Sequence, residues 1–159
     1  MIAACEEHRV PVYYSRDWHP SNHISFKARG GPWPTHCVQG TPGAEFHPSL
    51  RVPLHAVVIS KGDDPDEEAY SAFHETNLEE RLKETGTDKI ILGGLTTDYC
   101  VKESALDARR AGFAVEVLED CTRAVNAKSG DGAKALARIR KAGAKLTTTT
   151  EAIKELASR

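Results

Sequence analysis

The segment Lys89–Gly112 constrains the fold most, because it has the pattern of a buried strand, a tight turn and an amphipathic helix in succession. Its first residues form an apolar run typical of a strand. Further on, Val101, Ala105 and Ala108 fall on one helical face, while charged residues fall elsewhere. Gly112 is typical of the residue that follows a helix. A strand followed closely by a helix predicts an α/β fold.

Cys100 lies at the turn between this strand and this helix. The first turn of a helix presents free backbone N–H groups and the positive end of the helix dipole, so we expect a depressed pKa for this thiol. An isolated free cysteine is more often simply buried in a core. The position therefore predicts a nucleophile only if other reactive residues gather around it.

The rest of the chain repeats the alternation of strands and helices. Predicted strands cover Val10–Ser15, His55–Ser60, Ala114–Leu118 and Ala144–Thr147, and predicted helices cover Ile2–His8, Thr76–Leu82, Asp131–Ala142 and Thr150–Ala157. The predicted helix over Thr76–Leu82 is expected to open with a capping box formed by Thr76 and Glu79. The pattern predicts a single domain over residues 1–159, with an open, mostly parallel sheet flanked by helices on both faces, a Rossmann-like arrangement of three layers.

The charge balance and the apolar content of the chain indicate which kinds of partner it binds. The chain has 21 basic and 23 acidic residues, so it lacks the positive charge expected of a nucleic-acid or membrane-surface protein. No apolar run approaches the length of a membrane span, and the first residues do not resemble a signal peptide. The four cysteines form no C-x-x-C pair. We therefore expect a cytoplasmic protein with a small-molecule substrate, no nucleic acid and no membrane; a homo-oligomer is left open.

Three reactive side chains follow predicted strands. Asp17 follows the first strand, Lys61 the second and Cys100 the strand of the central segment. In parallel α/β sheets, ligands bind beyond the carboxyl ends of the strands. The sequence therefore predicts that these three side chains meet at one rim.

A metal site is predicted at the same rim. Asp17 and His19 are separated by one residue, so on extended chain both side chains leave the same face. A third ligand from the segment that contains His36 would complete a set of two histidines and one carboxylate, which is typical of catalytic metal sites with open positions. The alternative is that these are solvated loop residues, with Asp17 serving a turn. The remaining histidines are assigned to that ordinary role: His8, His47, His55 and His74.

Five segments carry the motifs of a known family: Arg16–Phe26, Gly31–Phe46, Ser60–Gly62, Ala69–Phe73 and Gly94–Val101. With these motifs the chain resembles the nicotinamidase/pyrazinamidase branch of the isochorismatase-like cysteine hydrolases. The resemblance covers almost the whole chain. It implies a metal-dependent amidohydrolase that converts nicotinamide to nicotinate and ammonia in NAD salvage, and that also acts on pyrazinamide.

The resemblance implies roles for individual residues. Cys100 would attack the carboxamide carbon, and Lys61 would favour its thiolate. The backbone N–H groups of Thr96 and Cys100 would form the oxyanion hole, with a cis peptide bond between Leu95 and Thr96. The residues implied to line the substrate pocket are Trp33, Tyr70 and Leu95.

The resemblance also implies a metal cofactor. Asp17, His19 and His36 match the family's ligands for one divalent ion, which is zinc, iron or manganese, and His23 is a possible fourth ligand. The ion would hold the pyridine nitrogen. The family's pattern does not decide which metal is bound.

One departure from the family concerns the start of the chain. Members of the family begin with a central strand that ends in an aspartate, the general acid/base, and no residue before Asp17 matches it. Glu6 and Glu7 are interpreted as surface charges. We therefore expect the domain to be N-terminally incomplete and slower than a chain extended by that strand. Two alternative functions remain: a metal- or pyridine-binding relative without activity, and a hydrolase of another small amide.

Overall fold

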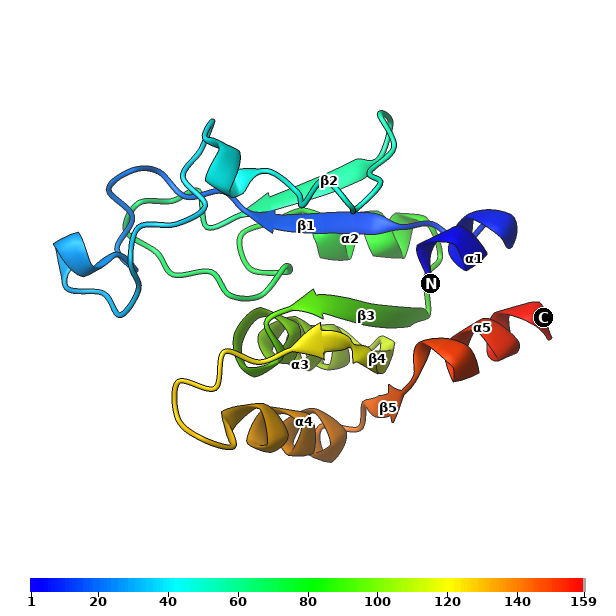
Figure 1. Cartoon of the computed structure of the whole chain (residues 1–159). Coiled ribbons are helices and arrows are strands. Elements are labelled where there is room, and N and C mark those ends of the chain that lie inside the picture. The colour runs from blue at the N-terminus through cyan, green and yellow to red at the C-terminus, as the bar shows by residue number, and fades with distance from the viewer. Residues whose placement is uncertain (159) are drawn as a thin grey trace.

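The computed structural model describes residues 1–158, and its helices and strands alternate as predicted (Figure 1). The strands are β1 (Tyr13–Asp17), β2 (Val57–Lys61), β3 (Lys89–Leu95), β4 (Ala114–Arg123) and β5 (Lys145–Thr147). The α-helices are α1 (Ile2–Glu7), α2 (Leu78–Glu84), α3 (Lys102–Arg110), α4 (Asp131–Lys141) and α5 (Thr149–Ala157). The short helical turns are η1 (Lys27–Arg29), η2 (Pro42–Ala44) and η3 (Thr97–Val101). The predicted α/β class is confirmed.

All strand pairs are parallel, but they form two sheets where one was expected. β1 pairs with β2, and β3, β4 and β5 form a second sheet in that order. Among residues 1–158, β1 and β3 exchange no ladder hydrogen bonds, which is why the sheet divides between them. In Figure 1, β1 and β2 lie in the upper part of the view, and β3, β4 and β5 lie below them. The expectation about a strand upstream of the chain stays a prediction.

β4 extends further than its apolar run indicates. The prediction ended it at Leu118, whereas the strand continues to Arg123 and pairs again with β3 after a register shift between Leu92 and Gly94. Backbone pairing therefore continues through polar residues, which the hydrophobic pattern alone does not detect.

Helices cover both faces of the β3–β4–β5 sheet. On one face, Val115 and Val117 of β4 lie in a core that includes buried residues of α2, α3 and α4. On the other face, Glu116 forms ion pairs with Lys89 at 2.9 Å and with Lys145 at 3.2 Å. Glu155 of α5 also pairs with both lysines, so α5 lies over this face. This alternation along β4 explains why a carboxylate is buried between two valines.

The ends of the helices follow local sequence. Gly112 adopts a φ of 95° after α3, as expected of a glycine that ends a helix. The capping box predicted at Thr76 does not form, because the Thr76 hydroxyl donates to the Ala72 carbonyl at 2.6 Å and α2 begins at Leu78. A capping box does form at α5 between Thr148 and Glu151. None of the helices within residues 1–158 is long and apolar enough to span a membrane.

Asp98 joins the turn before α3 to the loop after β4. Its carboxylate is buried and accepts the backbone N–H groups of Val125 at 2.9 Å and Asn126 at 2.8 Å. The Asn126 side chain in turn accepts the N–H of Gly132 in α4. Burial by itself would raise the pKa of Asp98, but the N–H donors more than offset burial and leave the pKa below its ordinary value.

This network predicts a pH-dependent contribution to stability. A lowered pKa in the folded state means that the stabilisation is present above the pKa of the unfolded chain and is lost as the pH falls through the folded-state pKa. We expect Asp98→Asn to lower the free energy of unfolding by about 1–3 kcal/mol at pH 7, and less in acid. Denaturant unfolding at pH 7 and at about pH 3 would measure both values.

The matched control is Asp63→Asn, because Asp63 is exposed. This control should leave the unfolding curve unchanged at both pH values. An Asp98→Asn protein as stable as the parent at pH 7 would contradict the role of the buried carboxylate.

Candidate active site

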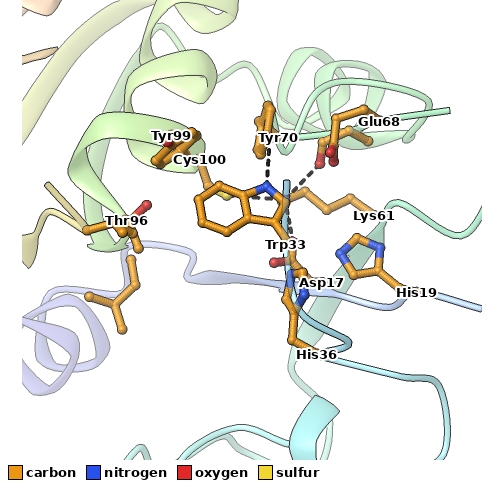
Figure 2. Close-up of a pocket in the computed structure, with 13 residues that line it drawn as sticks. Asp17, His19, Trp33, His36, Lys61, Glu68, Tyr70, Thr96, Tyr99 and Cys100 are labelled. Atoms are coloured by element: carbon orange, nitrogen blue, oxygen red, sulfur yellow. Dashed lines mark hydrogen bonds and ion pairs between the residues drawn. The ribbon is translucent and has the colours of Figure 1, made fainter. Parts of the chain in front are cut away.

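A pocket of about 270 Å³ lies beyond the carboxyl ends of β1, β2 and β3 (Figure 2). Asp17, Lys61 and Cys100 all line it, so the predicted convergence of these side chains is confirmed. Asp17 and Lys61 are opposite each other in the last register position of the β1–β2 pair. The parallel register therefore places both side chains at the same rim.

Lys61 is at the centre of the polar contacts in this pocket. Its side chain is only 4% exposed, and its ammonium donates to Asp17 Oδ1 at 2.5 Å, to the Ala69 carbonyl at 2.9 Å and to Cys100 Sγ at 3.5 Å. These acceptors come from β1, from the loop after β2 and from the turn after β3. One buried cation thus brings together three segments that are distant in sequence.

The same contacts set the protonation of Lys61 and Cys100. Burial lowers the pKa of Lys61, but Cys100 and Asp17 outweigh burial and raise it above its ordinary value, so the side chain is an ammonium. Burial raises the pKa of Cys100 by more than Lys61 lowers it. The expectation of a depressed pKa for Cys100 is therefore wrong, because the sequence does not reveal how deeply the sulfur is desolvated.

The turn that carries Cys100 differs from a regular first helical turn. Thr97–Val101 forms a π-helical turn, and α3 begins after it at Lys102. The peptide bond between Leu95 and Thr96 is cis, as the resemblance implied. The backbone N–H of Thr96 lies close enough to the Cys100 sulfur to lower the pKa of that thiol. The structure thus brings the two expected oxyanion-hole residues to the same place.

Asp17, His19 and His36 form a close group of possible metal ligands. One ligand atom of each lies within 4.8 Å of the others. His19 Nδ1 lies 2.8 Å from the Gly62 carbonyl, and His36 Nδ1 lies 2.8 Å from the Pro34 carbonyl. Because a carbonyl only accepts, each Nδ1 carries the proton and each Nε2 keeps its lone pair. Both imidazoles therefore have the tautomer that a metal ligand needs.

Gly62 allows His19 to approach the backbone this closely. A Cβ at position 62 would lie 2.6 Å from the His19 ring, and the residue has a φ of 65°. Burial lowers the pKa of His19, although its hydrogen bond with Gly62 and the charge of Asp17 oppose this effect. His19 is therefore held neutral.

His23 lies outside this group. Its side chain is fully buried, with Nδ1 2.7 Å from the Ser25 hydroxyl and Nε2 2.9 Å from the Glu67 carbonyl. Its ring packs against His19, with 4.1 Å between the ring centroids. Both nitrogens of His23 are already hydrogen-bonded, so the side chain supports His19 and does not face the pocket.

Aromatic side chains form the walls of the pocket. Trp33 Nε1 donates to the Tyr70 hydroxyl at 2.9 Å, and Tyr99 contacts both rings. Leu95, which is 70% exposed, lines the mouth. The sequence analysis missed Tyr99, Glu68 and Val125, which also line the pocket. Only their places in the sequence could have indicated them: Tyr99 directly precedes Cys100, Glu68 directly precedes Ala69, and Val125 follows β4.

Comparisons with known proteins agree with this site. A family model described as "Isochorismatase domain" matches residues 1–151. Nicotinamidase from Escherichia coli is 37% identical over 172 aligned residues, which take in 95% of this chain and 81% of that protein. The resemblance inferred from the motifs is confirmed.

Solved structures give the same result. The pyrazinamidase of Pyrococcus horikoshii in complex with zinc has a TM-score of 0.87 and 44% identity, and the match covers 92% of this chain and 80% of that chain. PnC1 from L. infantum in complex with nicotinate has a TM-score of 0.81 and 38% identity, covering 87% of this chain and 71% of that chain. The chain therefore belongs to the isochorismatase family, and within it is similar to the nicotinamidases and pyrazinamidases.

Proposed function

We propose that this chain hydrolyses the carboxamide of nicotinamide to give nicotinate and ammonia, and that it also accepts pyrazinamide, in the salvage of pyridine nucleotides. The observation that carries the proposal is the meeting of a cysteine, a buried lysine and a set of metal-ligand side chains in one pocket. The similar proteins named above, two of them nicotinamide or pyrazinamide hydrolases by name, support the choice of substrate.

In the proposed reaction, Cys100 Sγ attacks the carboxamide carbon, and the C–N bond breaks as ammonia leaves. The resulting thioester is then hydrolysed by water to nicotinate, so one difficult amide hydrolysis becomes two easier steps. The thiol proton ends on the departing nitrogen. Lys61 is already an ammonium and cannot accept that proton, but its charge stabilises the thiolate as it forms.

We propose that the backbone N–H groups of Thr96 and Cys100 stabilise the oxyanion of each tetrahedral intermediate. Such donors act in a largely desolvated site, where one is typically worth about 3–4 kcal/mol of transition-state stabilisation. The closeness of the Thr96 N–H to the Cys100 sulfur supports this assignment.

We propose that Asp17, His19 and His36 hold one divalent metal ion. The donor set fits, because both imidazoles present a free Nε2 and Asp17 Oδ1 alone is used by Lys61. Two histidines and a carboxylate suit zinc, iron or manganese, and the zinc complex of the pyrazinamidase favours zinc. When bound, the ion supplies a Lewis-acid contact for the pyridine nitrogen. The aromatic side chains then hold the ring while Cys100 reacts.

The proposal extends to the context of the protein. Residues 1–159 are proposed to act as one domain in the cytoplasm, with a small molecule as substrate. The four cysteines are unpaired in the structure.

The nucleophile is tested by two cysteine variants. We expect Cys100→Ala to reduce ammonia release from nicotinamide by at least about a thousandfold, because it removes the proposed nucleophile. Cys121→Ala is the control, since Cys121 is exposed and does not line the pocket, and it should keep the activity of the parent. Equal loss in the two variants would contradict the assignment. An inactive parent that binds nicotinamide would instead favour the non-catalytic relative.

The metal site is tested by metal analysis of purified variants. We expect His36→Ala to lose about 10- to 100-fold or more in metal affinity, because it removes one of three protein ligands. His47→Ala is the control, as His47 is an exposed histidine outside the pocket. A His36→Ala protein with the metal content of the parent would contradict the ligand set, and loss of metal from His23→Ala alone would move the site to His23.

A further inference from the structure

Glu68 is a pocket-lining carboxylate that the proposed chemistry does not use. It is half-buried, and it directly precedes Ala69, whose carbonyl accepts a hydrogen bond from Lys61. Figure 2 shows Glu68 on the same side of the pocket as Tyr70. A carboxylate that is partly removed from water at a substrate pocket needs an explanation.

Among the described side chains that line the pocket, none balances the charge of Glu68. Lys61 is the one lysine or arginine among the described residues that line it, and its ammonium is paired with Asp17 at 2.5 Å. These two charges cancel. Glu68 thus contributes a net negative charge to the part of the pocket next to Ala69 and Tyr70.

Tyr70 interacts with this carboxylate and also lines the pocket. The Tyr70 oxygen accepts from Trp33 Nε1, so its own proton is available to the Glu68 carboxylate, with which it interacts. Burial, opposed by the Trp33 hydrogen bond and assisted by Glu68, raises the pKa of Tyr70 to about 12. The phenol is therefore neutral and remains a hydrogen-bond donor.

We propose that Glu68 makes the pocket select uncharged carboxamides over carboxylates, and that it weakens binding of the anionic product. This inference rests on the proposed function. The reaction converts a neutral amide into a carboxylate beside a fixed negative charge, so repulsion arises only after the reaction. In a partly desolvated site, such repulsion is expected to change affinity by about tenfold. A bound metal ion changes the affinity for nicotinate equally in all variants, so its effect cancels when the variants are compared.

The test measures ligand binding in metal-loaded Cys100→Ala protein, where no turnover occurs. Calorimetry would give the dissociation constants of nicotinate and nicotinamide with and without Glu68→Gln. We expect Glu68→Gln to tighten nicotinate binding about tenfold and to change nicotinamide binding less than about twofold. The effect on nicotinate should shrink at high ionic strength, because salt screens the repulsion.

Two further variants separate charge from shape. Glu68→Asp keeps the charge and should keep weak nicotinate binding. Glu67→Gln alters the neighbouring carboxylate, which pairs with His74 at 2.7 Å and does not line the pocket, so it should change neither constant.

The possible results are distinct. If both ligands bind and Glu68→Gln leaves nicotinate binding unchanged, or tightens both ligands equally, the inference is overturned while the proposed function stands. If the parent background binds neither ligand, the proposed function fails and the inference fails with it.

Discussion

The buried ammonium of Lys61 is the interaction on which the rest of the site depends. Removing an ammonium from water costs several kcal/mol unless acceptors surround it. Here the acceptors are a carboxylate, a carbonyl and a sulfur from three separate segments, so satisfying one cation fixes all three relative to one another. If the end of β1 or the turn that carries Cys100 moved away, the ammonium would lose one of its three acceptors. The position of the proposed nucleophile, Cys100, is therefore tied to the stability of the folded chain.

These contacts also matter because the strands do not form one continuous ladder. β1 and β2 belong to one sheet and β3 to the other, so the Lys61–Cys100 contact crosses between the sheets. A second buried link, from the Ala72 N–H to the Ser104 hydroxyl at 2.9 Å, also joins the segment after β2 to α3. Side-chain contacts and the shared core of α2, α3 and α4 thus hold the two sheets together, as backbone pairing holds the strands together within each sheet.

Strands and helices could be predicted from the sequence where a local hydrophobic periodicity determines them. The apolar runs located the strands, the face formed by Val101, Ala105 and Ala108 located α3, and the rule for parallel sheets located the rim. The sequence did not allow prediction of features that depend on the surroundings of a residue. Desolvation reverses the expected pKa shift of Cys100, and the division of the sheet depends on pairing between distant strands. Glu68 carried no motif, so only its position beside the pocket distinguishes it from the exposed Glu67.

Asp17 connects the two halves of the proposed site. Its Oδ1 accepts from Lys61, and its other oxygen remains for a metal held with His19 and His36. A metal ion on Asp17 would withdraw charge from the same carboxylate that stabilises the Lys61 ammonium. In the proposed reaction, holding the ring and stabilising the thiolate are therefore coupled through one side chain. It follows that a change at Asp17 alters both functions at once, whereas a change at His36 leaves the Lys61 ion pair in place, because His36 is hydrogen-bonded to the Pro34 carbonyl and packs against Phe26 and Trp33.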